Sequence, residues 1–318
     1  MSQVRQRPAS DTAAARPRPV PERRPDRRAG VRRHLDGLRY PLGVWALSRL
    51  LVVVVVGAVG WVSRPRGQWE WWDVLVAPFA TWDAIWYLKI AEHGYDPLLA
   101  HGNSAAFFPL YPLTVRGVHE LVPVAGLAAT GVAVSTLLFA GVCVLLWRLT
   151  LVHYDEPTAR RTVVYLAVFP LAFVFSAVYT ESLFLLLTLA CFLMLERGRV
   201  WAASGFGALA ILTRPVGLLL APAIAWRVWT DAGRPWRLWG GPERRIRRAL
   251  LWRLAPVGLL PLAQIGFQLY LYLVTGQPFA SGAAEARGWG REVDVRLVLE
   301  LPVAWATALW ELFVGQGN

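Results

Sequence analysis

Charged residues are scarce in this sequence. Asp, Glu, Lys and Arg make up 17% of its 318 residues, whereas soluble proteins carry about 25%. Hydrophobic residues reach 56%, and the mean hydropathy is +0.41. This composition excludes an ordinary soluble domain, and several apolar stretches approach the roughly 20 residues that a membrane-spanning helix needs. We therefore predict a membrane protein.

Lysine and cysteine are nearly absent. Lys89 is the only lysine, so the net charge of +12 comes from arginine, a bias that indicates a GC-rich, bacterial genome. The arginines lie in the N-terminal tail and at the ends of apolar stretches, which favours contact with membrane lipids over nucleic acid. The two cysteines, Cys143 and Cys191, lie inside apolar stretches, so we expect no disulfide. The histidines are scattered, and we expect no metal and no cofactor.

The N-terminal half indicates a tail, two spans and a long loop. Residues 1–40 are rich in Arg, Pro and Ala, which predicts a disordered basic tail. By the positive-inside rule this tail is cytoplasmic, so Leu42 to Trp61 leads out of the cell and Val124 to Leu149, which is followed by Arg residues, leads back in. Residues 63–123 then form a large external loop. Within it, Phe107 to Val122 reads as an interfacial or re-entrant helix.

Two later apolar regions are interrupted by polar residues. Thr162 to Leu195 would make a helix of about 50 Å against a hydrocarbon core of about 30 Å, so we predict two shorter helices that turn at Tyr179–Ser182. The pattern recurs at Thr213–Pro215, which separates Val200–Leu212 from Val216–Trp229. Helices this short end partway through a bilayer where they line a water-filled cavity.

The remaining segments complete the expected topology. Residues 231–253 contain seven Arg and are predicted to form a cytoplasmic loop. Leu254 to Val274 then leads outward, and Leu297 to Val314 leads back in. The expected fold is an all-α polytopic membrane protein of about eight spans, with its membrane domain over residues 41–318, in the cell membrane.

The polar residues of the external segments gather on one face. They are Trp82, Asp83, Glu92, His93 and Tyr95 in the first loop, Tyr179 and Glu181 in the second turn, Arg214 in the third, and Gln277, Glu285 and Arg291 in the fourth. The topology came from arginine positions alone, so this common face is an independent observation. A charge near the bilayer centre costs about 2.5–3.5 kcal/mol on insertion scales. Glu181 and Arg214 therefore need a partner or a wet cavity.

Four segments of the chain resemble one known family. They are TWDAIWYLKIAEHGY (Thr81 to Tyr95) with AAFFPLYPL (Ala105 to Leu113), Phe169-Pro170 with SAVYTESLF (Ser176 to Phe184), LTRPVGLLL (Leu212 to Leu220), and TGQPF (Thr275 to Phe279) with WGR (Trp289 to Arg291). In this order they resemble the PIG-V-like mannosyltransferases of the GT-C superfamily. Two features depart from the family pattern. The family usually continues through further spans beyond Asn318, so we expect this chain to stop short, and Glu285 stands near an expected Gln.

The resemblance implies a reaction. The family transfers mannose from a polyprenyl-phosphate-mannose donor to a lipid or glycan acceptor outside the cytoplasm. In eukaryotes that acceptor is the GPI-anchor precursor, and a bacterial acceptor is left open. A membrane transporter or lipid flippase is the alternative, because broken helices and buried charges also mark substrate paths. A non-catalytic partner of a fuller enzyme is a third interpretation.

Asp83 is the expected catalytic base. Thr81 is predicted to cap a short helix, which would place Asp83 in the first turn, where the helix dipole favours an anion. A carboxylate there can take the proton of the acceptor hydroxyl while the sugar is displaced from phosphate, so one base suffices for an inverting mechanism. The alternative is that Asp83 is only a helix N-terminal residue.

The other expected site residues bind substrate. Arg214 and Arg291 offer fork-shaped guanidinium groups to the donor phosphate, although Arg214 could equally snorkel from a helix end. Glu181 would orient the acceptor or form a structural ion pair with Arg214. Trp82 and His93 complete the expected substrate-binding set, and an incidental loop position is the alternative for His93.

Overall fold

The computed structural model describes residues 27–63, 70, 72, 75–95, 103–123, 125–232 and 250–290. All regular structure in these ranges is helical. The elements are α1 (Arg27–Ser63), η1 (Ala77–Phe79), α3 (Ala84–His93), η2 (Asn103–Ala106), α5 (Leu110–Leu121), α6 (Leu127–His153), α7 (Glu156–Val168), η3 (Ala172–Phe175), α8 (Glu181–Glu196), α9 (Val200–Ile211), η4 (Pro215–Leu219), α10 (Leu220–Asp231), η5 (Ala255–Gly258), α12 (Leu259–Thr275) and α13 (Ala280–Trp289). The chain divides into one unit of residues 1–38 and another of residues 39–318, and the site lies in the second.

Within the described ranges, three helical segments are long and apolar enough to cross a bilayer. They are Gly37–Val59, Leu127–His153 and Leu250–Thr275. The prediction of a polytopic helical membrane protein is therefore confirmed. The last expected span, Leu297 to Val314, and most of the basic loop over residues 231–253 lie outside the described residues.

The first helix begins earlier than the sequence predicted. α1 starts at Arg27, inside the segment expected to be disordered, and continues past Pro41 to Ser63. Adding residues to an existing helix is much cheaper than nucleating one, so a span helix readily extends into an arginine-rich flank. Residues 1–26 lie outside the described residues.

Both apolar regions are interrupted as predicted, although the first break begins earlier than Tyr179–Ser182, and Glu181 and Ser182 already belong to α8. α7 ends at Val168, just before Pro170, and α8 begins at Glu181. α9 ends at Ile211, and the 3₁₀ turn η4 with Pro215 at its start separates it from α10. Proline cannot donate a backbone hydrogen bond and clashes with the preceding turn, so each break lies where the ring forbids continuation.

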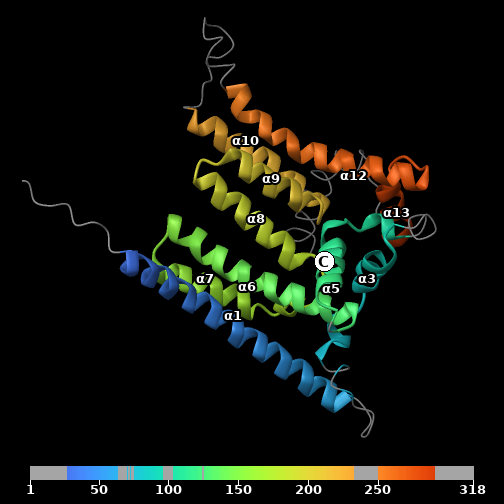
Figure 1. The fold of residues 1–318 in the computed structure, drawn as a ribbon, viewed down its shortest axis with the longest axis horizontal. Coiled ribbons are helices and arrows are strands. Elements are labelled where there is room, and N and C mark those ends of the chain that lie inside the picture. Colours follow the sequence, from blue (N-terminus) through green and yellow to red (C-terminus); the bar gives the residue numbers. More distant parts are fainter. Residues whose placement is uncertain are drawn as a thin grey trace, which may run out of the picture. The chain divides into compact units, whose positions relative to one another are not determined.

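The helices of the second unit pack in the order α6, α8, α9, α12, as Figure 1 shows. Glycines allow the close approaches in this row. A Cβ atom at Gly141 of α6 would lie 2.8 Å from the Leu186 side chain of α8, and one at Gly207 of α9 would lie 3.0 Å from Leu260 of α12. Small residues at helix contacts are typical of membrane bundles, where association depends on close packing.

The short elements of the first loop gather at one end of this row. Figure 1 shows α3, α5 and α13 together there, and η2 packs against α13. The predicted helix within Phe107 to Val122 is α5, whose 12 residues are too few to span a bilayer. It buries Tyr111, Pro112 and Val115 against the bundle.

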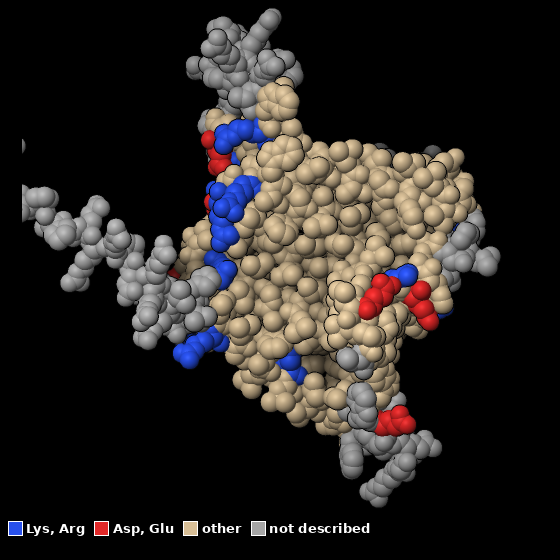
Figure 2. All heavy atoms as spheres, viewed as in Figure 1, with Lys and Arg blue, Asp and Glu red and all other residues tan. Residues whose placement is uncertain are grey.

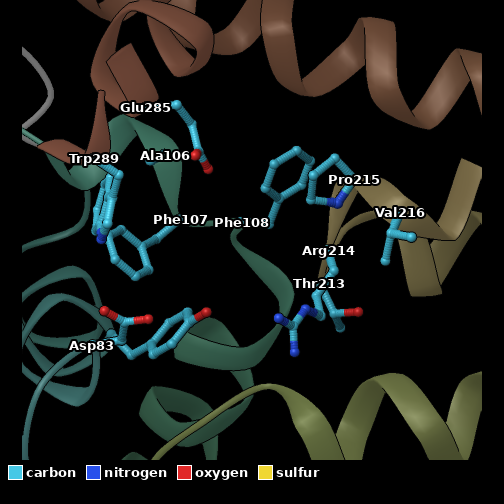
Figure 3. Close-up of a pocket in the computed structure, with 11 residues that line it drawn as sticks. Asp83, Ala106, Phe107, Phe108, Thr213, Arg214, Pro215, Val216, Glu285 and Trp289 are labelled. Carbon is cyan, nitrogen blue, oxygen red and sulfur yellow. The ribbon is translucent and has the colours of Figure 1, made fainter. Parts of the chain in front are cut away.

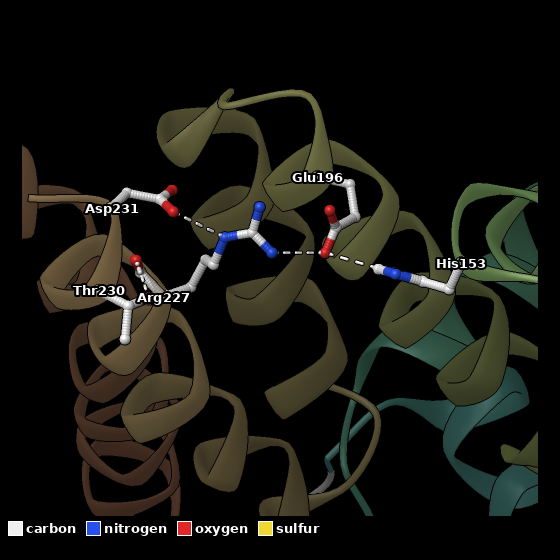
Figure 4. Close-up of polar contacts among 5 residues, drawn as sticks. All are labelled: His153, Glu196, Arg227, Thr230 and Asp231. Carbon is white, nitrogen blue, oxygen red and sulfur yellow. Dashed lines mark hydrogen bonds and ion pairs between the residues drawn. The ribbon is translucent and has the colours of Figure 1, made fainter. Parts of the chain in front are cut away.

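The other end of the row holds an ion-pair network (Figure 4). Arg227 Nη1 of α10 donates to Glu196 Oε1 of α8 at 2.7 Å, and its Nε donates to Asp231 at 3.0 Å. His153 Nε2, at the end of α6, lies 3.5 Å from the same Glu196 oxygen. Figure 2 shows Lys and Arg side chains along the edge where these helix ends lie, away from the first-loop elements. The two ends of the bundle therefore differ in charge.

Candidate active site

A polar cavity opens at the first-loop end of the bundle (Figure 3). Its volume is about 310 Å³. The lining residues come from α3, η2, the α9–η4 turn and α13, and are Asp83, Tyr87, Ala106, Phe107, Phe108, Thr213, Arg214, Pro215, Val216, Glu285 and Trp289. The side chains of Asp83, Arg214 and Glu285 point toward the same space from three separate elements (Figure 3). Residues far apart in the sequence thus share one concavity.

Two hydrogen bonds attach the Asp83 segment to the turn before α8. The backbone N–H of Val178 donates to the carbonyl of Phe79 at 2.8 Å, and the Tyr179 hydroxyl donates to the carbonyl of Thr81 at 3.2 Å. These bonds bracket the residues that lead into α3. They set the position of Asp83 relative to the polar turn at residues 179–182.

The expected cap of α3 is wrong. Asp83, not Thr81, directly precedes the helix, and the Thr81 hydroxyl instead donates to the carbonyl of Pro78 at 3.4 Å. Trp82 adopts a left-handed backbone conformation with φ of 56°, which turns the chain sharply before the helix. The Asp83 side chain makes no capping hydrogen bond; it is exposed and lines the cavity. A purely local helix-end role therefore does not account for it.

Arg214 and Glu181 form an ion pair across the two helix breaks. Arg214 Nη1 donates to Glu181 Oε1 at 2.6 Å, with side-chain exposures of 42% and 31%. Both charges are thus partly wet, as the sequence required of charges in apolar surroundings. Arg214 lines the cavity, whereas Glu181 is absent from its lining and contacts Arg214 at its margin.

The turn that carries Arg214 is fixed on both sides. The backbone N–H of Leu110 donates to the carbonyl of Leu212 at 2.9 Å, which ties the turn to the start of α5. Gly217 folds back so closely on α9 that a Cβ atom there would lie 2.7 Å from the backbone nitrogen of Ile211. Only glycine fits this approach, because the obstructing atoms are backbone.

The charged groups of the site shift the pKa values of two tyrosines, Tyr87 and Tyr179. Burial raises the pKa of Tyr87 well above its usual range; Glu181 and Asp83 also raise it, while Thr180 and Arg214 lower it. Burial, with Asp83 and Glu181 as further causes, raises the pKa of Tyr179 to about 12. Both hydroxyls therefore stay protonated at neutral pH. The carboxylates of Asp83 and Glu181 and the guanidinium of Arg214 thus all interact electrostatically with the hydroxyl of Tyr87.

Aromatic side chains form part of the cavity wall. Trp289 of α13 and Phe107 after η2 meet at a centroid distance of 5.6 Å, and Glu285 lies one helical turn before Trp289. α13 approaches η2 closely here, since a Cβ atom at Gly288 would lie 2.9 Å from the Asn103 side-chain nitrogen. The cavity therefore combines charged groups with an apolar, aromatic surface, a combination common in ligand sites.

The structure brings some of the expected site residues together and leaves others apart. Asp83 and Arg214 share the cavity, and Glu181 joins them through its ion pair. Trp82 is 72% exposed, and His93 lies 3.5 Å from Glu92 at the far end of α3; neither lines the cavity. Arg291 lies outside the described residues.

Several lining residues escaped the sequence reasoning. Tyr87 follows Asp83 by four residues, which on a helix places both on one face, so its position had a readable signal. Thr213 and Trp289 belong to the matched segments but carried no separate signal. Glu285 was expected on the common polar face but was not included among the substrate-binding residues. Among the described residues, no group of three or more His, Cys, Asp or Glu side chains is placed to hold a metal ion.

The fold and site define a class of protein. It is a polytopic helical membrane protein whose helix breaks and first-loop helix build a charged, aromatic-walled cavity at one end of the bundle. A family model described as "Mannosyltransferase (PIG-V)" matches residues 65–295, which include every described residue of that cavity. The chain belongs to this family.

Individual relatives agree with the family match. GPI alpha-1,6-mannosyltransferase 2 of Mus musculus is 35% identical over 154 residues, which are 46% of this chain and 30% of that protein. The Homo sapiens protein of the same name is 32% identical over 154 residues, with the same shares. GPI mannosyltransferase 2 of Drosophila melanogaster is 32% identical over 112 residues, 32% of this chain and 24% of that protein. The chain thus spans less than a third of these relatives' length. No solved structure matches it.

Proposed function

We propose that this protein is a membrane mannosyltransferase that moves mannose from a polyprenyl-phosphate-mannose donor to an extracytoplasmic lipid or glycan acceptor with inversion. The observation that carries the proposal is the cavity in which Asp83 and Arg214 face each other from separate elements. A carboxylate and a guanidinium are the two groups that sugar transfer from a lipid phosphate requires. Both lie within the family match.

Asp83 serves as the general base. Its carboxylate accepts the proton of an acceptor hydroxyl as that oxygen bonds to the anomeric carbon. The bond between this carbon and the phosphate oxygen breaks, and its electron pair leaves with the phosphate. A phosphate is a stable leaving group, so a second carboxylate is not needed to protonate it. Attack opposite the departing phosphate inverts the anomeric centre.

Arg214 binds the departing phosphate. Its guanidinium carries a permanent charge and several donors, which suit phosphate oxygens on which charge grows. The ion pair with Glu181 holds the side chain in one orientation before the donor arrives. We assign Arg291 to the same phosphate, and we keep Trp82 and His93 as the further substrate-binding residues that the sequence predicted. Glu285 and Trp289 offer the sugar a hydrogen-bond acceptor and a ring to pack against.

We infer that the cavity opens outside the cytoplasm. The arginine-bearing edge in Figure 2 lies away from it, and arginine marks the cytoplasmic side of membrane helices. This supports a cytoplasmic tail over residues 1–40, an external loop over residues 63–123, a cytoplasmic loop over residues 231–253, and a GT-C-type bundle of about eight spans in the cell membrane. The donor then enters sideways from the outer leaflet.

A cysteine at position 82 tests this sidedness. The native residue is 72% exposed, and both natural cysteines are buried, so a membrane-impermeant thiol reagent has one ready target. We expect Trp82→Cys to react in intact cells. As the control, cysteine replaces Arg197, which is exposed at the other end, and should react only after the membrane is opened. The reverse pattern would contradict the proposed topology.

Sugar transfer tests the proposed activity. The purified full chain, reconstituted with radiolabelled polyprenyl-phosphate-mannose and a membrane lipid extract, should move label into an acceptor fraction and release polyprenyl phosphate. The same donor carrying glucose serves as the specificity control. Movement of intact labelled donor between leaflets without transfer would contradict the enzyme and favour the flippase. A chain that transfers nothing alone but restores transfer in a partner's extract would favour the non-catalytic role.

A further inference from the structure

A second and larger cavity lies at the opposite end of the bundle. Its volume is about 490 Å³, and it shares no lining residue with the candidate active site. Residues 198–202, where α9 begins, line one side. Trp252, Arg253 and Pro256, near the start of the apolar segment Leu250–Thr275, line the other. The proposed transfer reaction gives this cavity no role.

The positive charge of this cavity favours binding of an anion. Arg199 and Arg253 both line the cavity and are exposed, and within the described ranges neither forms an ion pair with a carboxylate. Nearby Arg227, by contrast, contacts both Glu196 and Asp231. Two guanidinium groups that share one concavity repel each other, and an anion between them relieves this repulsion. Phosphate matches the fork of donors that each guanidinium presents.

Its other side chains place it at the membrane boundary. Trp201 is 65% exposed and Trp252 is 67% exposed, and both line the cavity. α9 and the segment Leu250–Thr275 are apolar and begin here. Residues at the ends of such helices lie at headgroup level, where indole rings are favoured because one part is apolar and the N–H is wet.

We propose that this cavity binds the headgroup of an anionic phospholipid. Arg199 and Arg253 contact the phosphate, and Trp201 and Trp252 pack against the glycerol and the first acyl carbons. Basic pockets between membrane helices recognise headgroups in this way. The first turn of α9 adds the positive end of a helix dipole to the same field. Free phosphate would engage the arginines and leave both rings unused, so the occupant is a lipid.

Lipid titration of the purified full chain tests the site. In neutral detergent, phosphatidylglycerol should raise the thermal midpoint and remain bound in native mass spectrometry, whereas phosphatidylcholine should do neither. The double variant Arg199→Gln/Arg253→Gln should weaken phosphatidylglycerol binding by about tenfold or more. High salt should weaken binding to the unchanged chain as well, because exposed charges are screened.

Matched controls separate this site from general attraction. Arg161→Gln/Arg197→Gln removes the same charge from exposed positions that do not line the cavity, and it should retain binding. Equal loss in both double variants would overturn the proposal in favour of diffuse electrostatics. Trp201→Ala/Trp252→Ala should also weaken lipid binding. A full effect of inorganic phosphate alone, or equal binding of phosphatidylcholine, would overturn the lipid assignment. None of these outcomes depends on the transfer reaction.

Discussion

Asp83→Asn should lower the rate of mannose transfer by about 10²–10⁴-fold, the contribution typical of a general base. Asparagine keeps the size of the side chain and one acceptor oxygen but cannot take up the proton of the acceptor hydroxyl. The effect should fall on kcat rather than on the KM for the donor, because Arg214, not Asp83, contacts the phosphate in the proposed complex. The measurement is a time course of label transfer at saturating donor with equal amounts of folded protein.

The matched control for Asp83 lies on the same helix. Glu92→Gln removes one carboxylate from the far end of α3, where the side chain is 65% exposed and outside the cavity. We expect it to transfer mannose at nearly the unchanged rate, and both variants to remain folded, since both side chains are exposed. Equal activity of Asp83→Asn and the unchanged chain would remove Asp83 from the mechanism while leaving the family membership intact.

Arg49→Leu should produce the largest loss of stability. Arg49 lies in the membrane-spanning part of α1 and is only 6% exposed. Its Nη1 donates to the carbonyl of Ala172 at 2.8 Å and to the Ser176 hydroxyl at 3.2 Å, and Nη2 donates to the carbonyl of Ala167 at 3.4 Å. The guanidinium also lies 4.5 Å from the centre of the Phe139 ring. No carboxylate contacts it among the described residues.

The magnitude follows from competing terms. Leucine would leave these buried acceptors without donors, at about 1–3 kcal/mol each. Against this, removing a charge from the membrane interior recovers about 2.5–3.5 kcal/mol. We expect a net loss of about 2–4 kcal/mol, since the cation–π contact is lost as well. The corresponding fall in Tm is about 5–15 °C.

Two further variants serve as comparisons for the Tm of Arg49→Leu. Arg49→Lys keeps the charge but presents a single ammonium point, so we expect an intermediate fall in Tm. Arg161→Leu removes an exposed arginine from α7 and should change Tm little. Arg49 donates hydrogen bonds to carbonyls at the break between α7 and α8. Glu181, which pairs with Arg214, follows Ser176 by five residues on the same segment. The leucine variant should therefore also slow mannose transfer. A Tm for Arg49→Leu equal to that of Arg161→Leu would contradict the stabilising role that we assign to the hydrogen bonds of Arg49.

Local patterns in the sequence were enough for the helices and their breaks. Hydropathy, span length and the polar residues at Tyr179–Ser182 and Thr213–Pro215 predicted an all-α membrane protein whose apolar regions are interrupted. The positions of the arginines predicted that the polar residues of the external segments share one face. The structure groups Asp83, Glu181 and Arg214 at one end of the bundle. These features were predictable because each depends on residues that are neighbours in the chain.

Only the tertiary structure decided which of those polar residues meet. Exposure and contact depend on packing between distant segments, so the sequence could not exclude Trp82 and His93 from the cavity, nor show that Tyr87 and Trp289 line it. The same holds for Arg49: the sequence places it inside the first span, but only the packing of α1 against the segment after α7 shows what it contacts. The polar face could be predicted from local sequence patterns. The cavity, in contrast, forms only because the breaks of two helix pairs and the first loop come together in the folded protein.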